Sequence, residues 1–168
     1  MLCLRMYLTD HTLLKIDISI SDQKLTLYDA DKPLLTSMVS TAENGFGQKI
    51  NSFQTPLGLH FIAEKSGENA KIKTYFQNRQ PLGLFQPSML SKYDDWILTR
   101  VIRLAGAEAG YNQGDDCDSY ERMIYIHGTP ELIQANDPKS HGCIRMPCIA
   151  LIALYNMINI GTKVEIHV

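Results

Sequence analysis

Apolar and polar residues alternate along most of the chain. Residues 14–20 carry leucine or isoleucine at every second position, with lysine, aspartate and serine between them. This period of two is typical of a strand that buries one face. A polar turn at 21–24 leads into a second alternating stretch, and the pattern predicts a β-hairpin over residues 13–29.

The same alternation predicts more strands further along the chain. They cover residues 34–40, 59–64, 96–105, 122–127 and 163–168. The segment 41–58 is rich in glycine, asparagine, serine and threonine and is predicted to be a long loop. Residues 77–95 are expected to be irregular. Long loops in compact domains often build binding sites.

One segment has the features of a helix. Pro147 stands near its start and Gly161 just past its end, which is the usual asymmetry of helix termini. Its apolar residues cover most of the circumference, so we expect the helix to be buried against a sheet. These elements predict one mainly β domain over residues 1–168, with a helix near its C-terminal end.

Composition and charge narrow the functional classes. The 168 residues are 45% apolar and 20% charged, and 16 basic against 18 acidic residues give a net charge of −2. No dense basic run is present, which argues against nucleic acid as a partner. The apolar stretches are too short to span a bilayer. Residues 1–22 lack the basic, apolar and small-residue regions of an export signal.

Four cysteines are too few for a disulfide scaffold. A disulfide between Cys117 and Cys148 stays open at this point. Cys148 and Cys3 are interpreted as small buried hydrophobes. Cys117 stands in an acidic loop, where negative charge would raise the pKa of its thiol and disfavour catalysis.

Cys143 has different surroundings, in the stretch SHGCIRM over residues 140–146. A free thiol, with a pKa of about 8.5, is only slightly ionised at neutral pH, and a nearby imidazole would raise the thiolate fraction. Gly142 lets the backbone turn tightly and approach a ligand. The N–H groups of Gly142 and Cys143 could then stabilise the oxyanion formed when the thiolate attacks a carbonyl.

Two histidines compete for the role of base. His141 is two residues from Cys143, so an extended backbone would point both side chains the same way. His127, sixteen residues before Cys143, ends a predicted strand and would be held more firmly. We favour His127 as the base and His141 as a neighbour that shapes the site or shares the proton.

Zinc binding is the alternative to a nucleophilic Cys143. The side chains of His127, His141, Cys143 and Cys148 are suitable ligand types. They lack the close Cys-Cys or His-His spacings of structural zinc sites, so the nucleophile hypothesis is preferred. Burial of Cys143 as a simple core residue fits poorly with its polar neighbours.

The histidine, the spacer and SHGCIRM together resemble the active-site signature of the L,D-transpeptidase (YkuD-type) catalytic domain. FQTPLGLHFI, residues 53–62, is similar to the Thr-Pro-x-Gly segment of that family, and DQKLTLYD, residues 22–29, is similar to its opening strand. The resemblance runs from about residue 16 to 168. It implies a β-sandwich or barrel-like fold with mixed sheets and a helix after the cysteine motif.

The resemblance also implies an activity and its residues. Cys143 would attack the bond between the diamino acid and D-Ala in a peptidoglycan stem peptide, with His127 as base. Backbone groups around His141 and Gly142 would hold the oxyanion, with Ser140 and Gly128 beside the substrate. Arg145 replaces the commoner asparagine and could pair with a stem carboxylate. No cofactor is required.

Several alternatives remain at this point. The acyl-enzyme could pass to an amine, as in a transpeptidase, or to water, as in an L,D-carboxypeptidase or a hydrolase of stem–protein links; a non-catalytic zinc or binding module is the third hypothesis. The substrate implies a periplasmic or cell-envelope location, although the absence of an evident export signal leaves the cytoplasm open. Arg100, Arg103 and the Asp94-Asp95 turn are expected to lie mainly at the surface. The oligomeric state is not predicted.

Overall fold

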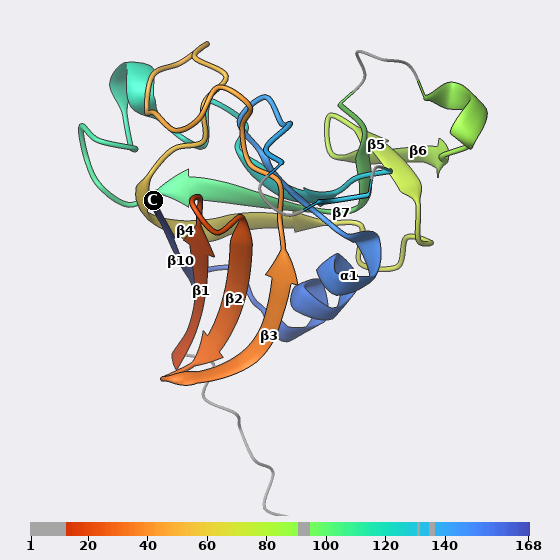
Figure 1. The fold of residues 1–168 in the computed structure, drawn as a ribbon, viewed down its shortest axis with the longest axis horizontal. Helices are drawn as coiled ribbons and strands as arrows, with labels where there is room; N and C mark the ends of the chain where they lie inside the picture. The colour runs from red at the N-terminus through yellow and green to blue at the C-terminus, as the bar shows by residue number, and fades with distance from the viewer. Residues whose placement is uncertain (1–12, 91–94, 131, 135–136) are drawn as a thin grey trace, which may run out of the picture.

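A computed structural model describes residues 13–90, 95–130, 132–134 and 137–168. Cys3 and Asp94 lie outside these ranges. Within them, ten strands form one curled, mixed sheet, and α1 (Cys148–Met157) packs beside it (Figure 1). This confirms the predicted mainly β fold with one helix near the C-terminal end.

The predicted hairpin comprises β1 (Leu14–Ser19) and β2 (Lys24–Asp29), and β3 (Lys32–Met38) pairs with β2. The parallel strand β10 (Lys163–His167) lies between β1 and β4 (Gly58–Ser66), which is followed in the sheet by β7 (Ile97–Gly106). The final alternating segment of the sequence therefore becomes a central strand.

Two expectations about local structure were wrong. Residues 77–84 are not irregular, because β5 (Thr74–Gln77) and β6 (Gln80–Leu84) form a hairpin that joins β7 through β5. Asn78 and Arg79 both have positive φ at its turn, and β6 contains Pro81, so the alternation is broken in the sequence. The strand expected at 122–127 begins only at Tyr125, as β8 (Tyr125–Gly128).

The core lies between the curled sheet and the helix. Ile16, Leu27, Ile102 and Ile126 are fully buried there, as the alternation of apolar residues requires. In α1 only Leu151, Leu154 and Tyr155 are buried, while Ile149 is 76% exposed. The helix therefore buries one side rather than most of its circumference. No helix of the described ranges is long and apolar enough to cross a membrane.

Two buried polar side chains tie loops to this frame. His60 on β4 has Nδ1 3.0 Å from the Gly58 carbonyl oxygen and Nε2 2.9 Å from the Ser119 hydroxyl. Burial lowers the pKa of His60 to about 4, so the ring is neutral. Gln23 Oε1 accepts a hydrogen bond from the Thr41 N–H at 2.9 Å, and Gln23 Nε2 donates to the Thr41 hydroxyl at 2.7 Å. These bonds hold the start of the 41–58 loop against the first hairpin.

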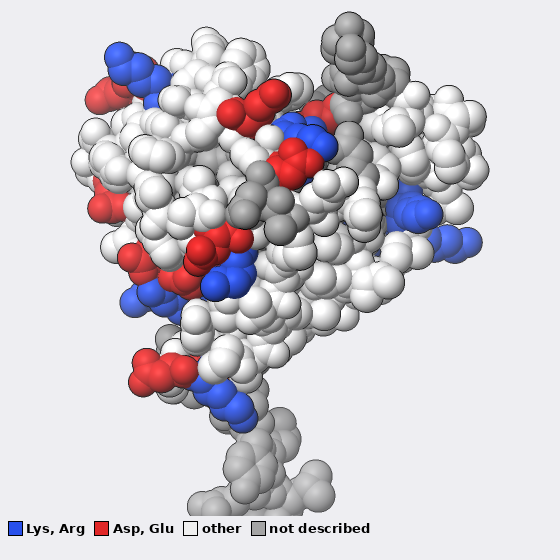
Figure 2. All heavy atoms as spheres, viewed as in Figure 1, with Lys and Arg blue, Asp and Glu red and all other residues white. Residues whose placement is uncertain are grey.

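Basic and acidic side chains are interspersed on the face shown in Figure 2, with no basic field. This agrees with the net charge of −2 and gives that face none of the clustered positive charge that phosphate binding requires.

Candidate active site

Two neighbouring parallel strands bring the predicted base and nucleophile together. β8 pairs with β9 (Ile144–Met146), and the register places His127 opposite Arg145 and Ile126 opposite Ile144. Cys143 directly precedes β9 and lies beside Tyr125. His127 and Cys143 line the same cavity, of about 290 Å³. The chain between them returns to the sheet as a parallel crossover.

The ring of His127 is held by a hydrogen bond that fixes its tautomer. The side chain is buried, and Nδ1 lies 2.9 Å from the Gly128 carbonyl oxygen. A carbonyl only accepts, so Nδ1 carries the proton and Nε2 of the neutral ring holds a lone pair. Nε2 is buried and has no hydrogen-bond partner among the described residues. Burial lowers the pKa of His127 and keeps the ring neutral.

The Cys143 thiol lies at the wall of this cavity and is half-buried. Its Sγ accepts the Tyr125 N–H at 3.4 Å and donates to the Met123 carbonyl at 3.5 Å. Burial raises the pKa of the thiol to about 12. The surroundings therefore favour the neutral thiol and do not raise the thiolate fraction as expected, so the proton must leave as the sulfur attacks.

The turn before Cys143 is held from both sides. Gly142 has a φ of +129°, which favours glycine. The buried Thr55 hydroxyl donates to the Gly142 carbonyl at 3.0 Å and accepts the Ala42 N–H at 3.0 Å. Ser140 Oγ accepts the Gly142 N–H at 3.2 Å and donates to the Cys143 carbonyl at 2.5 Å. The Gly142 N–H is therefore engaged within the turn.

Arg145 is buried rather than open to a ligand. Its guanidinium lies 2.8 Å from an Asp95 carboxylate oxygen, and its side chain is only 6% exposed. Asp95 also lies 3.6 Å from Nδ1 of His141, whose side chain is 59% exposed and meets the Phe53 ring edge-on. Asp95, expected in a solvated turn, is thus a member of the site that the sequence did not reveal.

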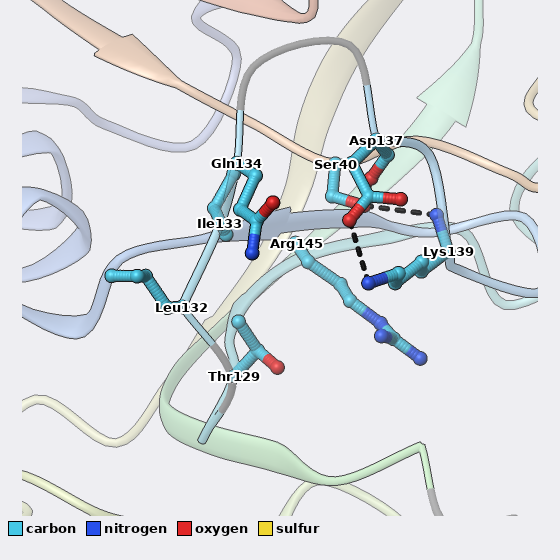
Figure 3. A pocket seen from close by; sticks show the side chains of 8 residues that line it. All are labelled: Ser40, Thr129, Leu132, Ile133, Gln134, Asp137, Lys139 and Arg145. Atoms are coloured by element: carbon cyan, nitrogen blue, oxygen red, sulfur yellow. Dashed lines mark hydrogen bonds and ion pairs between the residues drawn. The ribbon is translucent and has the colours of Figure 1, made fainter.

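Arg145 also lines a second, small pocket of about 10 Å³ (Figure 3). Asp137 and Lys139 form an ion pair of 2.6 Å over this pocket, and the Lys139 N–H donates to the Ser40 hydroxyl at 3.0 Å. Ser40 in turn exchanges both backbone hydrogen bonds with Arg145, each 2.9 Å long. These contacts fix the backbone two residues beyond the thiol.

Gly128 is required by close packing. A Cβ at this position would lie 2.6 Å from the Leu98 carbonyl oxygen and 2.9 Å from Cys148 Sγ. Both distances are shorter than normal contact, so no larger residue fits between β7 and the start of α1. The position that the resemblance placed beside the substrate therefore also has a packing role.

Four other residues considered in the sequence lie away from the cavity. Arg100 and Arg103 are buried, against expectation: Arg100 donates to the Ala70 and Thr99 carbonyls, and Arg103 pairs with Glu64. Cys117 and Cys148 are free thiols. Within the described ranges, no three His, Cys, Asp or Glu side chains are grouped closely enough to hold a metal ion.

The model of the L,D-transpeptidase catalytic domain (YkuD) matches residues 14–166. The chain therefore belongs to the YkuD family of L,D-transpeptidase catalytic domains. Among curated proteins, none matches this chain.

Solved structures of similar fold carry the same family name. An L,D-transpeptidase from Mycobacterium smegmatis is 15% identical, with a TM-score of 0.58 over 93% of this chain and 59% of that one. An L,D-transpeptidase from Mycobacterium tuberculosis H37Rv is 17% identical, with a TM-score of 0.57 over 93% of this chain and 58% of that one. An L,D-transpeptidase from Enterococcus faecium is 15% identical, with a TM-score of 0.56 over 92% of this chain and 49% of that one. The chain thus spans about half to three fifths of their length, and the likeness concerns the fold.

Proposed function

We propose that this protein is a cysteine acyltransferase that acts on peptidoglycan stem peptides, with Cys143 as nucleophile and His127 as base. One observation carries the proposal: the Gly128 carbonyl fixes the His127 tautomer and leaves Nε2 unpaired among the described residues, and His127 lines the same cavity as Cys143. Membership of the YkuD family supports the substrate class.

In the proposed reaction the Cys143 proton passes to His127 Nε2 as Sγ bonds to the carbonyl carbon of the diamino acid. The oxyanion accepts a hydrogen bond from the Cys143 N–H, because the Gly142 N–H already donates to Ser140 Oγ. The intermediate collapses, its bond to D-Ala breaks, and the imidazolium returns the proton to the departing amine. A thioester remains on Cys143. Attack by an acceptor amine, deprotonated by His127, releases the product and restores the thiol.

Transfer to an amine is favoured over hydrolysis by a second cavity. It has a volume of about 410 Å³, shares His141 with the Cys143 cavity, and is lined by Glu43, Asn44, Phe53 and Ser140. This space is large enough for an acceptor peptide, and Glu43 would attract its ammonium group.

The supporting roles follow from the contacts of the site. Arg145 and Asp95 orient the segment that carries the thiol, so we assign Arg145 to positioning in place of substrate binding. His141 stands between the two cavities and would contact either peptide. Ser140 fixes the turn, and Gly128 orients His127 through its carbonyl.

The deciding experiment is mass spectrometry of disaccharide-tetrapeptides incubated with the protein and with Cys143→Ala. Cross-linked dimers, or exchange of terminal D-Ala for an added D-amino acid, are expected only with Cys143 present. Tripeptides alone would mean a carboxypeptidase using the same residues. Equal products from both proteins would refute a role for Cys143.

We propose a cell-envelope location, because peptidoglycan, the proposed substrate, lies there. Labelling of intact cells with a membrane-impermeant maleimide, followed by mass spectrometry of the peptide containing Cys143, tests this location. Labelling only after cell lysis would contradict it.

A further inference from the structure

The Cys143 cavity carries an excess of positive charge. Two guanidinium groups, of Arg79 and Arg122, line it, and the only carboxylate among its described lining residues is Asp95. Asp95 forms an ion pair with Arg145, so its charge is already matched. The two lining arginines must therefore be balanced by other groups or by a ligand.

Arg79 shares its carboxylate with a second arginine. Its Nε lies 3.1 Å from one Glu64 oxygen, while Arg103 lies 3.3 Å from the other. The Tyr120 hydroxyl also bonds to Glu64. Glu64 is therefore shared by two guanidinium groups and is not dedicated to Arg79, while Asp118 also interacts electrostatically with Arg103.

Arg122 has only neutral partners among the described residues. Its guanidinium donates to the carbonyl oxygens of Gly47 at 3.1 Å, Gln48 at 2.7 Å and Gln54 at 2.6 Å, and to the Ser52 hydroxyl at 3.4 Å. These bonds satisfy the donors without cancelling the charge. Burial lowers the pKa of Arg122, as expected for a cation without a counterion.

Arg79 and Cys143 line the same cavity. Arg79 stands at the turn of the β5–β6 hairpin, and one amino group lies 3.4 Å from the Tyr125 hydroxyl. The Tyr125 N–H in turn donates to Cys143 Sγ at 3.4 Å. The Arg79 side chain is 33% exposed, and its contacts with Glu64 and Tyr125 engage only part of its five donors.

We propose that Arg79 is a specificity-determining residue that binds a carboxylate of the acyl donor, with Arg122 adding positive potential. The inference rests on the proposed function and defines the donor as a peptide with a free carboxylate close to the scissile bond. Two carboxylates have this chemistry: the terminal carboxylate of the leaving D-amino acid, and a side-chain carboxylate on the diamino acid. A planar guanidinium suits either one.

The test compares four synthetic stem peptides: with both carboxylates free, with either one amidated, and with both amidated. For the peptides that carry the recognised carboxylate, Arg79→Gln is expected to lower kcat/KM about tenfold, mostly through KM. Amidation of that carboxylate should lower the kcat/KM of the original protein by a similar factor. It should leave the kcat/KM of Arg79→Gln almost unchanged. Arg79→Lys should restore part of the loss. Lys24→Gln, an exposed lysine on β2, is the matched control and should change nothing.

A second measurement does not depend on turnover. The dissociation constants of the four peptides are compared for Cys143→Ala and for Cys143→Ala/Arg79→Gln, and only the peptides with the recognised carboxylate should bind more weakly to the double variant. If Arg79→Gln weakens charged and amidated peptides equally, Arg79 merely supports the hairpin and the inference is overturned. If no peptide is turned over but binding still depends on charge and on Arg79, the proposed reaction fails while the inference holds.

Discussion

Replacing Thr55 by valine removes a single hydroxyl from beneath the Cys143 turn. This buried hydroxyl accepts the Ala42 N–H and donates to the Gly142 carbonyl, both at 3.0 Å. Valine has nearly the same shape, so the packing is kept while two buried backbone groups lose their partner. A buried polar group left unpaired costs roughly 1–3 kcal/mol, and two such groups predict a loss of about 3 kcal/mol in the free energy of unfolding.

Urea denaturation measures this loss. With an m-value of about 2 kcal/mol/M, the midpoint should fall by about 1.5 M. Thr36→Val is the matched control, because the Thr36 hydroxyl has one contact, 3.3 Å from Thr26 on the outer hairpin. Its midpoint should fall by less than about 0.5 M. Thr55→Ser keeps the hydroxyl and should retain acylation of Cys143, while Thr55→Val should slow acylation even where it is fully folded. Equal midpoints for Thr55→Val and Thr36→Val would refute the reasoning.

Four further predictions concern the site and its supports. Asp95→Asn should destabilise the protein by about 2 kcal/mol, since it leaves the buried Arg145 charge without its carboxylate. Asp137→Asn, at a half-exposed pair, should cost under about 1 kcal/mol in the same urea titration. Because burial lowers the pKa of His127, the acid limb of kcat/KM should lie below pH 6.5, and a limb at or above 6.5 in the pH–rate profile would contradict the buried neutral ring. The pKa of His60 is lowered to about 4, so the unfolded chain binds a proton first as the pH falls, and His60 alone should lower stability by about 3 kcal/mol between pH 6.5 and 4. The buried His127 adds a loss of the same sign, so the His60 share is the difference between the original protein and His60→Gln in denaturation measured across that range. Gly128→Ala should lower the thermal midpoint more than Gly110→Ala, where a Cβ meets nothing within 4 Å and only the positive φ opposes it; equal shifts would mean that the β7 contact relaxes.

Local alternation of residues was enough to predict much of the fold. It predicted the first hairpin, β4, β7 and β10, although β7 is buried on both faces, so alternation located that strand without revealing its full burial. It failed for β5 and β6. These two strands are short, they flank a turn of two residues with positive φ, and β6 contains a proline. It also overestimated the burial of α1, because an apolar composition does not reveal which side of a helix faces the core.

Candidate residues could be singled out from the sequence where their chemistry is local, and not where it depends on tertiary contact. Cys143 and His127 stood out by residue type and by position at a strand end, and the structure places both at one cavity. Asp95 did not, because a carboxylate in a polar turn is indistinguishable from a solvated one until β9 brings Arg145 against it. The same holds for Arg79, whose position depends on the hairpin that alternation failed to predict.

The place of β10 in the sheet has a consequence for biosynthesis. This strand joins β1 to β4, so β1 and β4 cannot be linked through the sheet until residues 163–167 have been translated. During synthesis β1, β2 and β3 can form sheet pairs only with one another until most of the domain has been translated. Folding therefore cannot proceed in the order of synthesis, and a truncated nascent chain would expose an unpaired edge of β1 to other polypeptides. We expect Cys143 to become reactive only after β10 has paired with both β1 and β4.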